Sequence, residues 1–515
     1  MPEAHVGARI GQQLVWNSGL AAGARILSAA TSLAAVPVVV DKLGLAGFGT
    51  WEALLAIASL AGMFQSAVSG ALLWRQSEAY GRGDLEGAAR WVRFGMTATA
   101  LLFLVLVPSA WLARKVIVSA LNVPMQYAPT AIWLLPSLVA VIVLGAIADT
   151  LESVVSGFQS AGMVSLTTAA ALMVNYALVI AGVLAGLGLA SCLLGAACGV
   201  IVRACAAHYL ARRSIGRFSL VPGPPPRTSR ATLRYSGLLL VGYVSAALKD
   251  PTDKIILASL ASPSWTGYYG IASRLAGLAL EFTRFFYFPL LAAVAAMNAR
   301  GSWDAVRRMY DAMMTVVPAV SGCVVVVVAG LYDRLLVLWI GRNVPEVATL
   351  LLLLLTGNAF GVMLTGPGTS LSRGIGKVWI ETMYILVNLA LNLVLTAVLV
   401  VLVGPVGTVI ASGAAWTASS VVFALVLHRV LDLPGAATRR AALALACVPV
   451  AAAVTRFASS AFPASVSRPD ALQALLGLGA LSVAVYVVLL GLTGVVSRTT
   501  ISNVISVFGD RNSGR

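Results

Sequence analysis

The sequence has little charge. Asp, Glu, Lys and Arg make up only 10% of its 515 residues, against about 25% in a soluble globular protein. Hydrophobic residues account for 59%, and the mean hydropathy is +0.92. This composition excludes a soluble enzyme and is typical of an integral membrane protein. The five cysteines lie in apolar runs without CxxC spacing or a histidine cluster nearby, so we expect neither a disulfide nor a metal site.

Motifs of nucleotide and zinc chemistry are also missing. We find no Walker A sequence, no Rossmann glycine pattern and no HExxH sequence, and we expect no cofactor. The predicted outside loops are short, and the longest inside connection covers residues 211–234. Membrane glycan polymerases and ligases usually carry a substantial external loop with catalytic residues. We therefore expect that the chain is not an enzyme.

Apolar runs long enough to cross the ~30 Å hydrocarbon core of a bilayer follow one another along the chain. None alternates like an outer-membrane β-strand, so an all-α integral membrane protein is expected. The first run is too long for a signal peptide and should stay as an anchor. The predicted spans are 15–40, 48–74, 92–112, 130–156, 164–185, 187–210, 235–260, 265–292, 312–331, 346–370, 379–403, 405–427, 441–458 and 471–496.

The net charge of +16 is distributed in a way that predicts the topology. With the N-terminus inside, cytoplasmic segments hold 22 of the 35 Lys and Arg residues, and outside loops hold seven. This bias follows the positive-inside rule and places both termini in the cytoplasm. The basic segment 211–234 is expected to face anionic lipid headgroups, and we expect no nucleic-acid partner.

The two sides of this basic segment resemble each other. AYGRGDLEGAARW at 79–91 and MNARGSWDAVRRM at 297–309 share an Arg-Gly pair and the pattern that follows it, so that Gly83 corresponds to Gly301. The same or nearly the same offset along the chain relates four further pairs of positions: Gly49 and Gly267, Gly186 and Gly404, Asn175 and Asn392, His208 and His428.

This internal similarity predicts the domain organisation. A six-helix unit is duplicated, and because six is even, both copies enter the membrane from the same side. Transporters with such parallel repeats have an axis along the membrane normal and bind substrate between the two halves. The predicted parts are an N-terminal lobe at 1–210, a cytoplasmic linker at 211–234, a C-terminal lobe at 235–428, and two extra helices with a cytoplasmic tail at 429–515.

Four charges and a proline interrupt the seventh predicted span, in AALKDPTDKIILASL at 246–260. Lys249 and Asp253 are four residues apart, as are Asp250 and Lys254, so both pairs can meet on a helix. The two lysines lie ~21 and ~28 Å along the span, in the outer half of the bilayer. We expect a self-paired, neutral cluster at a helix break near the outer mouth. The alternative is ion or proton coupling through Asp250 or Asp253.

Two arginines lie near the middle of predicted spans. Arg25 is ~15 Å from the inner face in span one, and Arg274 has a similar depth in span eight. Neither has an acid three or four residues away. Since a charge there costs ~2.5–3.5 kcal/mol on insertion scales, each should face a water-filled cavity, where guanidinium groups suit a phosphate. The alternative is a distant acidic partner: Glu52, Asp149, Glu152 or Glu281.

Four other polar residues are weaker cavity candidates: Asp149, Glu152, Glu281 and Asn388. Asp149 and Glu152 share a face of span four, and acids at the membrane boundary are favoured there over a proton-linked role. Glu281 is expected to pair with Arg284. Asn388 belongs to a polar stripe on span eleven, of a kind that joins helices more often than it binds substrate.

Five segments carry a resemblance to a known family: LGLAGFGTWEALLAI, RQSEAYGRGD, DKIILASLASPSWTGYYGIASRL, PLLAAVAAMNARGSWDAVRRMY and NLALNLVLTAVLVVLVGPVGTVIASGAAW. Over roughly residues 15–430 the chain resembles the polysaccharide flippases, the Wzx-type O-antigen and exopolysaccharide transporters. These belong to the multidrug/oligosaccharidyl-lipid/polysaccharide (MOP) exporter superfamily.

The resemblance implies a V-shaped, two-lobed transporter that works by alternating access. It would move a lipid-linked oligosaccharide, usually on undecaprenyl diphosphate, across the bacterial inner membrane for surface polysaccharides such as the O-antigen of lipopolysaccharide. Arg25 and Arg274 fall where related lipid II flippases keep cavity arginines, and they would hold the diphosphate. After GYYGIASRL the chain reads AGLALEF in place of an LPLG-type sequence. This departure favours a surface polysaccharide over a peptidoglycan precursor.

The expected partners are the lipid-linked oligosaccharide, membrane lipids, and glycan polymerases or other biosynthesis proteins, around a monomeric transporter. A multidrug extruder of the same superfamily is an alternative, although it would need acidic cavity residues for its cationic substrates. A lipid II flippase is a second alternative. A membrane glycan polymerase or ligase and a non-transporting scaffold are less favoured.

Overall fold

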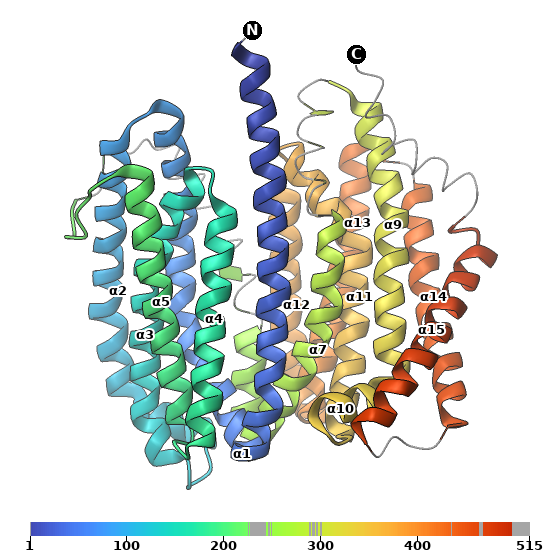
Figure 1. Ribbon diagram of the computed structural model, residues 1–515. Helices are drawn as coiled ribbons and strands as arrows, with labels where there is room; N and C mark the ends of the chain where they lie inside the picture. Colours follow the sequence, from blue (N-terminus) through green and yellow to red (C-terminus); the bar gives the residue numbers. More distant parts are fainter. Residues whose placement is uncertain are drawn as a thin grey trace. The chain divides into compact units, whose positions relative to one another are not determined.

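The computed structural model of the chain (Figure 1) has only α-helices as regular secondary structure in the residues that it describes. Eleven of the described helices are long and apolar enough to cross a membrane. The chain divides by its internal contacts into a first unit, Met1–Gly270, and a second unit, Ile271–Arg515. The described residues are 2–224, 226, 244–245, 248, 250–287, 290, 294, 297–298, 301–433, 435–462 and 467–496.

The first unit is a helical bundle around α3. Its helices are α1 (Pro2–Arg82), α2 (Leu85–Ala120), α3 (Ala128–Gly157), α4 (Ala161–Leu184) and α5 (Ala190–Ile215). The helix α3 packs against α1, α2 and α5, and more than half of its most apolar stretch is buried. It is apolar over most of its length, as suits a central helix, and carries two acids, Asp149 and Glu152, near its C-terminal end. The helix α2 buries very little of its apolar stretch, as expected of a helix that faces lipid.

The first two predicted spans lie within α1. This helix contains a non-helical residue, Gly44, with φ of 68° and ψ of 171°. Its position matches the predicted loop between the spans, and glycine adopts such a backbone without steric cost. The first unit also contains the helical segment 250–260, from predicted span seven, and the first turns of α7 (Pro263–Tyr287).

The second unit is built around α11. Its helices are the rest of α7, α9 (Trp303–Gly330), α10 (Tyr332–Ile340), α11 (Pro345–Gly374), α12 (Trp379–Val403), α13 (Val406–Leu431), α14 (Gly435–Ser460) and α15 (Arg468–Leu492). The helix α11 packs against α9, α13 and α14. The two helices beyond the predicted repeat, α14 and α15, pack against α9 and against each other.

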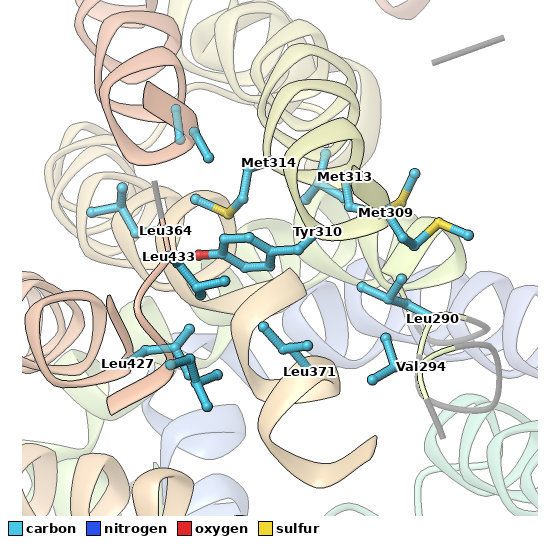
Figure 2. Close-up of a cluster of buried hydrophobic side chains, with 14 of the residues drawn as sticks. Leu290, Val294, Met309, Tyr310, Met313, Met314, Leu364, Leu371, Leu427 and Leu433 are labelled. Atoms are coloured by element: carbon cyan, nitrogen blue, oxygen red, sulfur yellow. The ribbon is translucent and has the colours of Figure 1, made fainter. Parts of the chain in front are cut away.

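A buried apolar cluster joins α9, α11 and α13 in the second unit (Figure 2). The ring of Tyr310 lies among Met314, Leu364 and Leu433, and its side chain is 1% exposed. Its hydroxyl is 3.4 Å from Nε2 of His428, so the buried polar atom has a partner. The unbranched, flexible methionine side chains are suited to filling the space around the ring.

The helices repeat along the chain with a nearly constant offset. Four helices of the first unit each have a counterpart whose first residue follows at this offset: Leu85 of α2 and Trp303 of α9, Ala128 of α3 and Pro345 of α11, Ala161 of α4 and Trp379 of α12, Ala190 of α5 and Val406 of α13. Both α3 and α11 have 30 residues, and both α5 and α13 have 26. The two halves therefore share this order of helices, and two of the four pairs have the same length.

The turns between these helices repeat as well. Gly83 and Gly301 have φ of 67° and 68°, and Gly186 and Gly404 have φ of 83° and 75°. Side chains disfavour this backbone region, so glycine is favoured at each of these turns. Gly83 and Gly301 make the same turn, because the same backbone hydrogen bonds surround them, whereas the turn at Gly186 joins α4 to α5 by a longer connection than the one at Gly404 between α12 and α13.

Candidate functional site

The charges of predicted span seven form a cluster with α1 and α7 inside the first unit. Nζ of Lys254 lies 3.2 Å from Oδ2 of Asp250 and 3.0 Å from Oε2 of Glu52. The hydroxyl of Tyr269 lies 3.2 Å from Oδ1 of Asp250 and 3.1 Å from Oδ2 of Asp253, so it can donate its proton to one carboxylate at a time. Three helical segments therefore meet through these five side chains, which we call the Lys254 cluster.

The Lys254 cluster is more widely connected than the sequence predicted. The local pair of Asp250 and Lys254 is confirmed. Lys249 lies outside the described residues, so its pairing with Asp253 stays a prediction. Sequence reasoning treated the four charges as self-paired and missed two members, Glu52 of α1 and Tyr269 of α7. Residues 250–260 are helical, including the proline that was expected to kink or break the span.

The acidic side chains of the Lys254 cluster need these partners because they are buried. Glu52 is 2% exposed and Asp253 is completely buried. A charge at such a position is tolerated only where it is paired and hydrogen-bonded. Gly270 provides the room for Glu52, because a Cβ at that glycine would lie 3.2 Å from Cγ of the glutamate.

A second charged cluster joins α3 to α5 in the first unit. Nε of Arg203 donates to Oε1 of Glu152 at 2.7 Å, and its Nη2 contacts Oε2 of Glu152 and Oδ1 of Asp149. One guanidinium thus holds both acids, in the paired geometry that arginine favours with carboxylates. The side chains of Arg203 and Asp149 are each about a quarter exposed.

The two acids of α3 therefore join two helices, and they are more than acids at a membrane boundary. Sequence reasoning missed Arg203, although a signal was present. Arg203 lies at nearly the same distance from the predicted inner end of its span as Asp149 and Glu152 do from theirs. Charges at one depth on neighbouring helices are natural partners.

The polar stripe of α12, formed by Glu381, Asn388 and Asn392, joins this helix to neighbouring helices, as predicted. Nδ2 of Asn388 donates to Oγ of Ser419 at 3.0 Å, and Nδ2 of Asn392 donates to Oγ of Ser412 at 2.7 Å. The third member, Glu381, pairs with Arg373 at the end of α11. Asn388 is 7% exposed, so its role in this structure is to join helices.

The two arginines predicted to hold a phosphate lie on different units. Arg25 is on α1 with an exposed side chain, and Arg274 is on α7 with a half-buried one. Each makes at least one hydrogen-bond, ionic, ring or electrostatic interaction. Glu281 is also on α7, but its side chain and its pairing with Arg284 lie outside the described residues. A shared diphosphate site of Arg25 and Arg274 stays a prediction.

A family model described as polysaccharide biosynthesis protein matches residues 14–294, from α1 beyond the end of α7. The chain belongs to this family. The matched region contains both charged clusters and both arginines. A search of curated proteins found no match.

Solved structures show which fold this polysaccharide biosynthesis family member adopts. The lipid II flippase MurJ, in an inward closed conformation, matches with a TM-score of 0.70 and 13% identity, over 91% of this chain and 97% of MurJ. An inward-facing multidrug resistance MATE transporter of the MOP superfamily gives 0.64 and 13%, over 80% of this chain and 96% of its own.

A third structure is a MOP superfamily transporter from Pyrococcus furiosus. It matches with a TM-score of 0.57 and 14% identity, over 82% of this chain and 96% of its own, and its binding pocket is described as having reverse polarity. At such low identity these matches show the fold alone. The family member therefore has the fold of MOP superfamily transporters, which is the fold class expected from the sequence.

Proposed function

We propose that this protein flips a lipid-linked oligosaccharide, carried on undecaprenyl diphosphate, across the bacterial inner membrane for surface polysaccharide assembly. The observation that carries the proposal is the match of residues 14–294 to polysaccharide biosynthesis proteins, in a chain with the fold of MOP transporters. The transporter fold supports a role in moving the glycan across the membrane rather than in synthesising it. Both termini face the cytoplasm in this proposal, and glycan polymerases use the flipped product.

Arg25 and Arg274 hold the diphosphate in this mechanism. A guanidinium stays charged at any physiological pH and matches two phosphate oxygens with parallel hydrogen bonds. Neutralising the phosphate charges lowers the cost of moving the anionic headgroup through the membrane. The glycan passes through a hydrated cavity, while the lipid tail stays in the bilayer. An ion gradient, the membrane potential or substrate mass action supplies the energy.

An extruder of cationic compounds is the second candidate. The observation in its favour is the Lys254 cluster in the first unit, which holds three carboxylates, two of them paired with Lys254 and the third hydrogen-bonded by Tyr269. Carboxylates attract cations, whereas the two arginines of the diphosphate proposal repel them. The two functions therefore differ in which residues they require.

The test is to delete the gene in its host and to measure undecaprenyl-diphosphate-linked oligosaccharide on the cytoplasmic face. The deletion strain is then complemented, and the wild-type gene should clear the trapped lipid. Arg25→Ala and Arg274→Ala should not clear it. Each loses a charge-assisted hydrogen bond of about 1.5–3 kcal/mol, which weakens binding of the diphosphate about tenfold or more. Arg25→Lys and Arg274→Lys keep the charge and should rescue in part. Arg342→Ala, at an exposed arginine between α10 and α11, is the matched control.

Two outcomes would contradict the proposal in different ways. No accumulation in the deletion strain, together with altered sensitivity to cationic drugs, would favour the extruder. Full rescue by both alanine variants at wild-type protein levels would leave the flippase in place but remove the arginines as anchors of the diphosphate.

A further inference from the structure

The chain after α5 returns to the helical bundle and docks on α2 in the first unit. Residues 217–223, which we call the strap, have no regular secondary structure. The ring of Phe218 packs against the ring of His208 on α5, with the centroids 5.4 Å apart. At the other end, the Thr97 hydroxyl of α2 donates to the carbonyl of Gly223 at 2.7 Å and accepts from its N–H at 2.9 Å. The strap therefore connects α5 to α2.

Arg93 of α2 lies against the docked end of the strap. Its Nε donates to the carbonyl of Val221 at 3.4 Å, and its backbone carbonyl accepts from the N–H of Gly223 at 3.2 Å. A Cβ on Gly223 would lie 2.9 Å from Nε and 3.1 Å from Cβ of Arg93. A larger side chain at Gly223 would therefore displace the strap, the guanidinium, or both.

The strap takes the place that α14 has in the second unit. When α2 and α9 are aligned from their first residues, Thr97 falls on Thr315. The Thr315 hydroxyl accepts from Nε of Arg440 on α14 at 3.2 Å. His428, which corresponds to the histidine of α5, contacts the first turn of α14 through Nε2. In each copy, corresponding threonine and histidine residues hold the segment that follows the last helix of the repeat.

The charges at these two corresponding contacts differ. In the second unit, Asp311 of α9 pairs with Arg440 of α14. In the alignment of α2 with α9, Arg93 falls on Asp311, and the strap provides Gly223 where α14 provides Arg440. The guanidinium of Arg93 is thus left without a carboxylate partner among the described residues. The repeated fold does not require a positive charge at this position, because the second copy carries a negative one.

Three further arginines beside the strap have no acidic partner either. They are exposed, and none forms an ion pair with a residue that the structure describes: Arg212 and Arg213 in the last turn of α5, and Arg217 in the strap. The acids at this end of α2, Asp84 and Glu86, pair with Arg90 instead. The strap and its surroundings therefore carry four positive charges that no described acid compensates.

The predicted topology places the strap at the depth of the lipid headgroups on the cytoplasmic side. Its contacts on α2 are at residues 93–97, in the first turns of the span predicted at 92–112, and it follows the span predicted at 187–210. Two of its side chains are apolar and exposed, Leu220 by 41% and Val221 by 64%. Exposed apolar side chains beside basic ones are typical of segments that lie in the membrane interface.

We propose that the strap, with Arg93, Arg212 and Arg213, binds the phosphate headgroup of an anionic phospholipid in the cytoplasmic leaflet. Guanidinium groups hold phosphate oxygens with parallel hydrogen bonds. Four or more basic residues directly on the cytoplasmic side of a membrane helix are typical of such sites. Val221 follows Arg217 at a distance of at most about 14 Å, so the docked strap keeps Arg217 near Arg93. The site uses neither arginine of the proposed diphosphate site.

The arginines are tested by titrating the purified, full-length protein with phosphatidylglycerol and counting the bound lipids by native mass spectrometry. Wild type should bind phosphatidylglycerol more tightly than the zwitterionic phosphatidylcholine. Arg217→Gln should weaken the binding of phosphatidylglycerol about fivefold, which is the effect of one arginine near an anionic surface. The Arg217 side chain makes no hydrogen bond, ion pair or ring contact with a described residue, so its loss should leave the fold intact.

Arg90→Gln is the matched control for the loss of a charge. Arg90 lies one turn before Arg93 on α2, but Asp84 and Glu86 already compensate its charge. This variant should keep the wild-type affinity for phosphatidylglycerol within about twofold. Equal losses with Arg90→Gln and Arg217→Gln would show that only the net charge matters, and they would overturn the site.

Gly223→Leu tests the docking of the strap, since it changes no charge. Displacing the strap separates Arg217 from Arg93, so phosphatidylglycerol should bind about fivefold more weakly. Gly81→Leu, near the same end of α1, is the matched control, because a Cβ there would meet nothing within 4 Å. Wild-type affinity in the Gly223→Leu variant would mean that the basic segment acts without docking, and this result would also overturn the site.

Undecaprenyl diphosphate, as a third ligand, distinguishes the phospholipid site from the proposed substrate site. Its affinity should not change with Arg217→Gln. If this substitution weakened undecaprenyl diphosphate as much as phosphatidylglycerol or more, or weakened neither, the assignment to a phospholipid would be overturned. If phosphatidylglycerol bound as expected and undecaprenyl diphosphate did not bind the wild type, the phospholipid site would stand and the proposed function would be contradicted.

Discussion

Two helix pairs that occupy the same place in the repeat are joined by different chemistry. In the first unit, α3 and α5 are joined by the guanidinium of Arg203, which holds Asp149 and Glu152. In the second unit, α11 and α13 meet where Gly357 faces Gly413, and a Cβ on Gly357 would lie 2.7 Å from Cα of Gly413. One contact is charged and partly exposed, and the other is close packing of backbone.

The helix arrangement does not depend on which of these contacts is present. When α3 and α11 are aligned from their first residues, Asp149 and Glu152 fall on Gly366 and Thr369. When α5 and α13 are aligned in the same way, Arg203 falls on Ser419, so none of the three counterparts is charged. Close packing of small residues is enough to hold such a pair in a membrane. The charged pair in the first unit therefore carries a desolvation cost that the architecture alone does not require.

The largest effect is expected from Arg203→Ala, which leaves two acids of α3 without their partner. Breaking a buried ion pair costs about 3–5 kcal/mol of unfolding free energy, and the partial exposure of Arg203 and Asp149 places this case at the lower end. Unfolding of the purified protein by SDS in mild detergent measures the loss. The neutral variant Asp149→Asn/Glu152→Gln/Arg203→Met should recover most of it. If Arg203→Ala alone were as stable as wild type, the charged contact would contribute no more than close packing does.

A smaller effect is expected from Gly357→Ala in the second unit. The added Cβ meets backbone atoms of α13, which cannot rotate away, so α11 and α13 must separate slightly. Such overpacking costs about 1–3 kcal/mol in the same SDS titration. Gly477→Ala in α15, where a Cβ would meet nothing within 4 Å, is the matched control and should not destabilise. Equal effects of the two substitutions would mean that the close contact of α11 and α13 is unimportant.

The smallest effect is expected from Asn392→Ala between α12 and α13. Loss of its hydrogen bond to Ser412 should cost about 0.6–1.7 kcal/mol, the range for interhelical hydrogen bonds in membranes. Thr356→Ala is the control, because the Thr356 hydroxyl donates to a carbonyl of its own helix. If Asn392→Ala destabilised as much as Arg203→Ala, the contrast between neutral and charged contacts would be lost.

The features predicted correctly from the sequence are those that depend on residues close together along the chain. Asp250 and Lys254 pair because they are one helical turn apart, and Asn388 and Asn392 bind one helix because their spacing places them on one face. The nine-residue helix α10 was missed, because it is too short to produce an apolar run of membrane length.

The partners of Glu52 and Arg203 could not be predicted in the same way. Glu52 and Lys254 are far apart along the chain, and Asp149 and Arg203 lie on different helices. Their pairing depends on how each helix is rotated about its own axis. That rotation is set by contacts with several neighbouring helices at once, so no single span contains the information.

By itself the sequence determined a helical membrane protein with a duplicated unit and recurring turns at Gly83 and Gly301. Hydrophobic length, helical spacing and the backbone freedom of glycine are local properties, and they can be counted along the chain. Only the tertiary structure decided that Gly49 touches Gly267, that Lys254 reaches Glu52, and that Arg203 holds two acids. These contacts follow from the close packing of helices against one another, in which the position of each helix depends on all of its neighbours.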